Sequence, residues 1–195
     1  MSRERPRVLV FGGSLRRESW NHKLAQFAAG ALRDAGAEAT LIRLSDFPFP
    51  IYDGDLEERE GLPEPALRLR QQFLGHDALF IASPEYNSSV SGALKNAIDW
   101  VSRPVEGEKD LAAFRGKVAA LVSASPGALG GLRGLVHLRA ILGNIGVIMV
   151  PKQHCVAAAP EAFGETGELV AERDRKAVKS VAEDLVELTR GVLGG

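Results

Sequence analysis

The stretch RVLVFGGSLRRESWNHKL, residues 7–24, decides the fold because it joins a short apolar run to a helical pattern through a polar loop. Residues 8–11 are apolar and short enough for a buried strand, and Gly12-Gly13 ends the run. The polar loop that follows includes Ser14, Arg16, Ser19 and Asn21 before a helical pattern begins. Unpaired N–H groups at a helix N-terminus attract anions, and hydroxyl and guanidinium groups donate well to phosphate oxygens. The stretch therefore predicts a phosphate-binding loop.

A plainer interpretation of the same loop stays open. Gly-Gly-Ser after a strand can be an ordinary turn, and Ser19 or Asn21 can serve as a helix cap. Arg16 favours the phosphate, because it adds a positive charge where anions already bind. The sequence has neither the G-x-G-x-x-G motif of dinucleotide-binding proteins nor the G-x-x-x-x-G-K-[ST] motif of P-loops. We therefore expect a terminal phosphate, bound without magnesium.

The composition is that of an ordinary globular protein and argues against several classes. With 195 residues, 45% hydrophobic and 25% charged, the chain suits a single domain over residues 1–195. The net charge of −1 gives no reason to expect nucleic acid, and no apolar run reaches the roughly 18 residues that span a membrane. One cysteine, Cys155, cannot form an internal disulfide, which fits the cytoplasm. The four histidines have no paired spacing, so we expect no metal site.

Five short apolar runs alternate with amphipathic segments along the chain. The runs predict strands at residues 8–11, 37–42, 78–82, 117–122 and 147–150, the last of them ended by Pro151. Helical periodicity predicts helices from residue 21 to Gly36 and near residues 65–74, 92–102, 132–142 and 173–189. Residues 45–65, rich in proline and acid, are expected to form a loop. The alternation indicates an α/β fold with a parallel sheet, order 2-1-3-4-5, and helices on both faces. Ligands bind such sheets where the winding reverses, between strands one and three.

Two further loops are expected at the same edge of the sheet. The loop after the third strand begins SPEYN, residues 83–87, where Tyr86 offers a flat face and Asn87 both donates and accepts hydrogen bonds. A surface turn is the alternative there, with Glu85 as a solvated acid; for Trp100, further along, we prefer packing in the core or in an interface. The loop SASPGALGG, residues 123–131, lets backbone N–H groups form a concave nest for an electron-rich atom.

Three segments resemble those of a known family. GSLRRESWNHKLA (13–25), PEYNSSVSGALKNAIDW (84–100) and SPGALGG (125–131) are similar to the signature segments of the NADPH-dependent FMN reductases, a flavodoxin-like group that includes quinone, azo-dye and chromate reductases. The loop FPFPIYDGDLE (47–57) resembles the family's stretch near the dimer contact. Ser91 stands where many members have proline, and a small residue there still permits the turn. The resemblance implies a flavodoxin-like three-layer sandwich.

The resemblance also implies the members of the site. The first loop would bind FMN, with Ser14, Arg16, Ser19 and Asn21 on its phosphate and Leu15 beside them. The flavin ring would be lined by Pro84, Glu85, Tyr86 and Asn87, and approached from the fourth loop by Ser125 and Gly127. NADPH or NADH would be the electron donor. The chain would form a homodimer through the helix after Asn96, or a homotetramer built from two dimers.

These inferences lead to an FMN-dependent NAD(P)H oxidoreductase that reduces a quinone, a flavin, an azo compound or a metal oxyanion in a ping-pong cycle. Because the flavin carries the chemistry, we nominate no catalytic residue. Two alternatives stay open: a non-enzymatic FMN-binding electron carrier, which would usually be more acidic, and a flavin-based sensor or partner-binding protein. A phospho-receiver module is disfavoured, because Gly12-Gly13 and Ser83 stand where it needs acidic residues.

Overall fold

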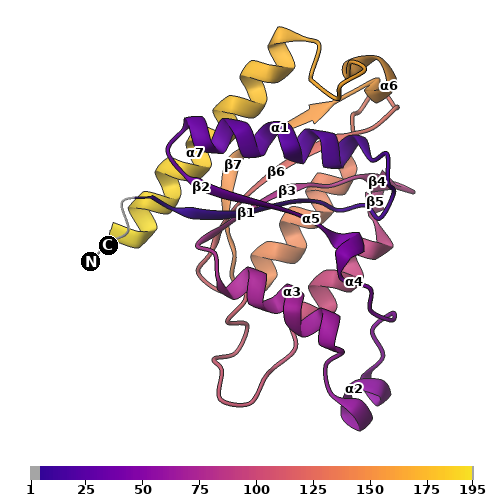
Figure 1. Ribbon diagram of the computed structural model, residues 1–195, viewed down its shortest axis with the longest axis vertical. Helices are drawn as coiled ribbons and strands as arrows, with labels where there is room; N and C mark the ends of the chain where they lie inside the picture. Colours follow the sequence, from indigo (N-terminus) through magenta and orange to yellow (C-terminus); the bar gives the residue numbers. More distant parts are fainter. Residues whose placement is uncertain (1–4, 195) are drawn as a thin grey trace.

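A five-stranded parallel sheet forms the centre of the protein. The computed structural model describes residues 5–194, and Figure 1 shows the sheet crossing the middle of the molecule. In spatial order its strands are β2 (Glu38–Arg43), β1 (Arg7–Gly12), β3 (Ala78–Ala82), β6 (Val118–Ala124) and β7 (Ile148–Val156). Each neighbouring pair is parallel. The predicted order is confirmed, and the winding reverses between β1 and β3.

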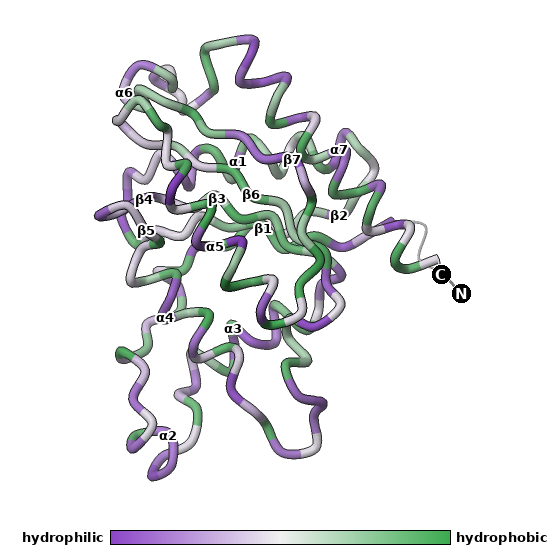
Figure 2. Tube along the Cα trace, turned by 180° about the vertical axis from the view of Figure 1, so that it is seen from behind, coloured by the Kyte–Doolittle hydropathy of each residue, from purple (hydrophilic) through white to green (hydrophobic). Residues whose placement is uncertain are grey.

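Helices cover both faces of this sheet (Figure 1). Helices α1 (Trp20–Asp34) and α7 (Glu172–Gly194) pack on one face, and α3 (Glu64–Leu74), α4 (Gly92–Val101) and α5 (Leu132–Asn144) pack on the other. The connections carry the short helices η1 (Leu44–Asp46), α2 (Gly54–Glu60) and α6 (Ala159–Ala162). Strand side chains alternate between the two cores: Val8 and Val10 belong to the first, Leu9 and Phe11 to the second. Every residue of β3 is buried, and Figure 2 shows hydrophobic colouring along the central strands.

The last strand continues past Pro151, so the prediction that it ends there is wrong. Strand β7 runs to Val156. Its register against β6 shifts between Ala119 and Leu121, and Pro151 lies in this irregular stretch. Because β7 is at the edge of the sheet, a proline in a bulge there removes no essential hydrogen bond between strands.

Helix α2 and a β-hairpin are two of the elements that lie where the sequence predicts only loops. Helix α2 begins after Asp53, whose Oδ1 accepts a hydrogen bond from the Asp55 N–H at 2.9 Å. No residue of α2 is buried, so it has no apolar stripe for a periodicity search to detect. The second is an antiparallel hairpin after β3, formed by β4 (Glu85–Tyr86) and β5 (Ser89–Val90). Both elements are too short to show a pattern in the sequence.

Trp100 packs inside the protein, as preferred from the sequence. It is completely buried, and its Nε1 donates a hydrogen bond to the Pro50 carbonyl at 2.8 Å. One turn earlier, Asn96 donates to the same carbonyl at 2.9 Å and accepts from the Tyr52 N–H at 2.8 Å. The Tyr52 ring meets Trp100 edge-on, with centroids 5.0 Å apart. Helix α4 therefore holds residues 50–52 in one conformation, with the exposed side chain of Ile51 between two anchored neighbours.

Candidate functional site

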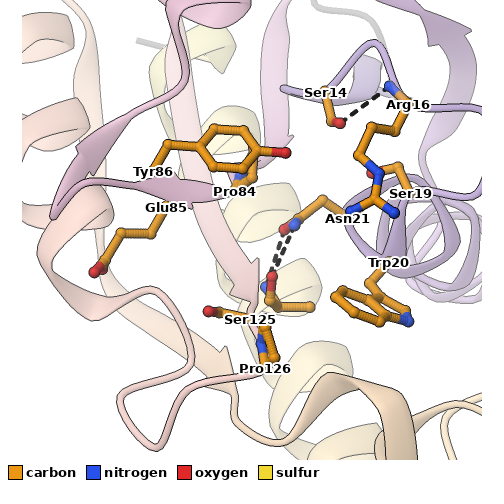
Figure 3. Close-up of a pocket in the computed structure, with 11 residues that line it drawn as sticks. Ser14, Arg16, Ser19, Trp20, Asn21, Pro84, Glu85, Tyr86, Ser125 and Pro126 are labelled. Carbon is orange, nitrogen blue, oxygen red and sulfur yellow. Dashed lines mark hydrogen bonds between the residues drawn. The ribbon is translucent and has the colours of Figure 1, made fainter.

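The loops after β1, β3 and β6 meet at the carboxyl edge of the sheet and border one pocket. The pocket encloses about 220 Å³ and is shown in Figure 3. Its lining consists of Ser14, Arg16, Ser19, Trp20, Asn21, Pro84, Glu85, Tyr86, Ala124, Ser125 and Pro126. Eight of the predicted site residues are therefore gathered here, whereas Leu15, Asn87 and Gly127 lie outside the lining.

Hydrogen bonds tie the first loop to its neighbours. The Gly13 N–H donates to the Ala82 carbonyl at the end of β3, at 2.9 Å. The Ser91 hydroxyl donates to the Gly13 carbonyl at 2.5 Å and accepts from the Leu94 N–H at 3.1 Å, which makes Ser91 the N-cap of α4. A proline at position 91 could make neither bond, so this departure from the family pattern adds a cap and a tie between two loops.

The first loop presents hydrogen-bond donors at the beginning of α1. Ser19 is the N-cap, and its Oγ accepts from the His22 N–H at 3.3 Å. Its hydroxyl proton is still available, so capping the helix and binding an anion are compatible roles. Ser14 Oγ accepts from the Arg16 N–H at 3.2 Å. Within residues 5–194, the exposed Arg16 guanidinium pairs with no carboxylate and lies 6.0 Å from the centre of the Trp20 ring.

Asn21 joins the first loop to the fourth. Its side chain is 3% exposed. The amide Nδ2 donates to the Ala124 carbonyl at 2.8 Å, and Oδ1 accepts from the Ala124 N–H at 2.9 Å. These two bonds are the pair of dashed lines between Asn21 and the end of β6 in Figure 3. Asn21 thus sets the distance between α1 and the end of β6, and its second Nδ2 proton is left for a ligand.

The loop after β3 brings Tyr86 to the rim of the pocket. The turn of the β4–β5 hairpin is formed by Asn87 and Ser88, with φ of 49° and 65°. Two successive positive φ values are typical of a type I′ turn, where asparagine is favoured. The Tyr86 ring is 48% exposed and points into the space bordered by Ser14 and Asn21 (Figure 3). Asn87 therefore shapes the turn that carries Tyr86, and its predicted place beside a flavin ring stays a prediction.

Glu85 lines the pocket, and its carboxylate forms hydrogen bonds with the beginning of α5. Its carboxylate points away from Arg16 and Asn21 (Figure 3) and accepts from Arg133 Nη2 at 2.6 Å and from the Gly134 N–H at 3.1 Å. Burial raises the pKa of Glu85, but these hydrogen bonds and the Arg133 charge outweigh burial and lower the pKa below its ordinary value. The side chain is only 8% exposed, so the alternative of a solvated loop acid is wrong.

The fourth loop closes the pocket with Ser125 and Pro126. Gly127, whose N–H donates to Ser125 Oγ at 3.4 Å, lies just behind this lining. Trp20, Ala124 and Pro126 are the pocket residues missing from the sequence prediction. All three stand next to predicted members of the site, so adjacency along the chain was the available signal.

A second, apolar cavity lies beside the first loop. It encloses about 200 Å³ and is lined by Leu15, Leu44, Ser45, Phe47, Pro48, Phe49, Ala93 and Asn96. Leu15 is 57% exposed and faces this cavity instead of the pocket with Arg16. Ile51, on the segment anchored by α4, is 84% exposed. An apolar cavity next to exposed apolar side chains is typical of a surface that another molecule covers.

The first pocket combines hydrogen-bond donors with flat or apolar surfaces. Ser14, Arg16 and Ser19 supply donors at the beginning of α1, where the helix dipole favours an anion. Trp20, Pro84, Tyr86 and Pro126 supply flat or apolar surfaces. In residues 5–194 no group of three or more potential ligand side chains could hold a metal ion. The same residues include no helix with the length and apolar character needed to cross a membrane.

Comparisons with known proteins agree with this geometry. The family model described as NADPH-dependent FMN reductase matches residues 6–161. An NAD(P)H-dependent FMN reductase of Pseudomonas aeruginosa is 36% identical over 189 residues, covering 96% of this chain and 97% of the relative. An NADPH:quinone oxidoreductase of Arabidopsis thaliana is 34% identical over 193 residues, covering 96% and 94%.

Solved structures agree as well. FerB, a flavoenzyme NAD(P)H:(acceptor) oxidoreductase from Paracoccus denitrificans, superposes with a TM-score of 0.77 at 30% identity, over 95% of this chain and 98% of that one. A flavodoxin from the domain Archaea, only 9% identical, superposes with a TM-score of 0.61 over 94% of this chain and 98% of that one, which shows the flavodoxin-like fold alone. The family model covers most of the chain, and relatives match it nearly end to end. The chain therefore belongs to the NADPH-dependent FMN reductase family.

Proposed function

We propose that the chain is a single-domain, FMN-dependent NAD(P)H oxidoreductase whose acceptor is a small molecule such as a quinone, a flavin, an azo compound or a metal oxyanion. The observation that carries the proposal is the pocket of Figure 3, where the exposed Arg16 guanidinium and a capped helix start lie opposite Tyr86. The quinone and FMN reductase activities in the names of its relatives support it. The single cysteine supports a reducing compartment, the cytoplasm.

The donor set of the pocket fits FMN. Ser14, Arg16 and Ser19 suit its phosphate, together with the backbone N–H groups at the start of α1. Pro84 and Tyr86 suit the ring, and the Ser125 hydroxyl in the lining suits its polar edge. When bound, FMN would accept a hydride from NAD(P)H and then reduce the acceptor. The protein's part is to bind and orient, so no side-chain acid or base is assigned.

The purified protein tests the proposal directly. It should bind FMN, and NADPH or NADH should bleach the flavin absorption under anaerobic conditions, with the colour restored by a quinone. An electron carrier would bind FMN but oxidise almost no NAD(P)H. If the folded protein binds no FMN when FMN is added in excess, the proposal is wrong.

Arg16 is expected to contribute measurably to FMN affinity. A hydrogen bond to a charged group contributes about 1.5–3 kcal/mol. Arg16→Ala should therefore raise the Kd for FMN roughly 10- to 100-fold, measured by titrating the apo-protein. Arg17→Ala is the matched control, because Arg17 is also exposed but does not line the pocket. Equal Kd values for the Arg16 and Arg17 variants would remove Arg16 from the site.

We also propose that a second copy of the chain covers the apolar cavity and Ile51, forming a homodimer that can pair again into a tetramer. Full burial of an isoleucine contributes about 1.5–3 kcal/mol, and a symmetric dimer carries the substitution twice, so Ile51→Ala should raise the dimer Kd roughly 100-fold or more. Analytical ultracentrifugation over a concentration series measures this. Val170→Ala is the control, since Val170 is 56% exposed in the segment before α7. A wild-type protein that is monomeric at all concentrations would contradict the proposal.

A further inference from the structure

The β4–β5 hairpin is docked on the beginning of α5. Glu85 on one strand accepts hydrogen bonds from the Arg133 guanidinium and the Gly134 N–H. On the other strand, Ser89 Oγ lies 2.9 Å from His137 Nδ1, one helical turn further along α5. Gly134 allows the close approach, because a Cβ there would lie 3.3 Å from the Ser89 carbonyl oxygen and 3.4 Å from Glu85 Cβ. Hairpin and helix therefore pack almost backbone to backbone.

Helix α5 has no cap within its own loop. Its N-cap is Gly131, which has no side chain to accept a hydrogen bond. Glu85 takes that role from the neighbouring loop: its Oε2 accepts from the N–H of Gly134, the third residue of the helix, at 3.1 Å. A carboxylate at this position also complements the positive end of the helix dipole. The bond is partly buried, and the Glu85 side chain is 8% exposed.

We infer that Glu85 is a positioning residue: by capping α5 from outside, its carboxylate fixes the Tyr86 hairpin at the rim of the pocket. Its link to FMN affinity rests on the proposed function, whereas the cap itself is a property of the protein alone. The carboxylate reaches α5 and not the pocket, so it acts on a ligand through Tyr86 and the turn that follows (Figure 3). Glu85 is thereby distinguished from Arg16 and Ser19, whose polar groups line the pocket.

Two other roles for Glu85 make different predictions. If its carboxylate bound the ligand directly, its loss would weaken FMN binding without loosening the hairpin. If it served only as the ion-pair partner of Arg133, then Arg133→Met would loosen the hairpin as much as Glu85→Ala. In the capping role, Arg133→Met has the smaller effect, because the Gly134 N–H keeps its acceptor.

Hydrogen exchange in the full chain, with and without FMN, tests the inference. Glu85→Ala should speed exchange of the Gly134 amide and of the β4–β5 amides by roughly tenfold or more, since it removes a charged cap. Glu85→Gln, which keeps one acceptor, should give a smaller increase and guards against a Glu85→Ala protein that fails to fold. Glu64→Gln is the matched control: Glu64 also lies in the first turn of a helix, α3, but pairs with Arg68 on the surface. In Glu64→Gln, exchange of the Gly134 amide and of the β4–β5 amides should match the wild type.

The outcomes separate this inference from the proposed function. If exchange at Gly134 and in the hairpin is unchanged in both Glu85 variants, the capping role is overturned, whether or not their Kd for FMN changes. Faster exchange together with a Kd for FMN raised by a similar factor supports the full inference. Faster exchange with an unchanged Kd overturns the link to the ligand. If the wild type binds no FMN, the proposed function fails, and exchange without FMN still decides whether Glu85 caps α5.

Discussion

Asn21→Ala is expected to destabilise the protein by roughly 3 kcal/mol or more and to weaken FMN binding with it. The variant loses both hydrogen bonds to Ala124 and leaves the N–H and the carbonyl of that residue without partners. Each buried group left unsatisfied costs about 1–3 kcal/mol. The spacing between α1 and the end of β6 then relaxes, and this spacing sets the width of the pocket between Asn21 and Ser125.

Urea denaturation of the apo-protein measures the loss of stability, and titration with FMN measures the loss of affinity. Asn144→Ala is the control, because Asn144 is exposed at the end of α5 and should change stability by less than about 0.5 kcal/mol. Asn21→Asp separates the two bonds: it keeps the acceptor for the Ala124 N–H but sets a carboxylate against the Ala124 carbonyl. If Asn21→Ala and Asn144→Ala have the same free energy of unfolding, the hydrogen bonds of Asn21 do not stabilise the contact between α1 and the end of β6.

Asn21 also illustrates how far the sequence alone can lead. Its type and its place at the beginning of the helical pattern were enough to predict a helix cap or a phosphate ligand, because both patterns are local. Its actual partner, Ala124, lies 103 residues further along the chain, and no local pattern indicates that contact. Ser19, in contrast, accepts its hydrogen bond from the nearby His22 N–H. It therefore caps the helix, which was one of the two interpretations of the loop. Roles that depend on neighbours in the sequence could be predicted, and contacts between residues far apart in the sequence could not.

The fold was predictable for a related reason. Strands covered on both faces must be apolar throughout, as β3 is, and this signal survives without any knowledge of the neighbours. The prediction that the strand ends at Pro151 was wrong because it assumed that proline always ends a strand. Whether proline is tolerated depends on the position of the strand in the sheet, and an edge strand tolerates it. The direction of the Glu85 side chain is a similar case, because it depends on α5 arriving beside the hairpin.

Gly131→Ala is expected to be one of the most damaging single changes in the loops around the pocket. Gly131 has a φ of +96°, where a side chain is strained. A Cβ there would lie 1.8 Å from Ser123 Oγ and 2.9 Å from Ser123 Cβ, well inside van der Waals contact. Strain and overlap together should cost about 4 kcal/mol or more in the free energy of unfolding. Gly127→Ala is the control: its Cβ would meet only Ser125 Oγ, at 3.9 Å.

A second substitution in the same pair isolates the cause. The buried Ser123 hydroxyl has no hydrogen-bond partner among residues 5–194, so Ser123→Ala alone should leave stability within about 1 kcal/mol of the wild type or increase it. In the Ser123→Ala, Gly131→Ala double variant the 1.8 Å overlap disappears, while the positive φ and the contact with the remaining Cβ persist. The double variant should therefore recover part of the loss, and a double-mutant cycle from urea denaturation measures the coupling. If the two effects simply add, the overlap with Ser123 is not what excludes a side chain at position 131, and backbone conformation alone accounts for the glycine.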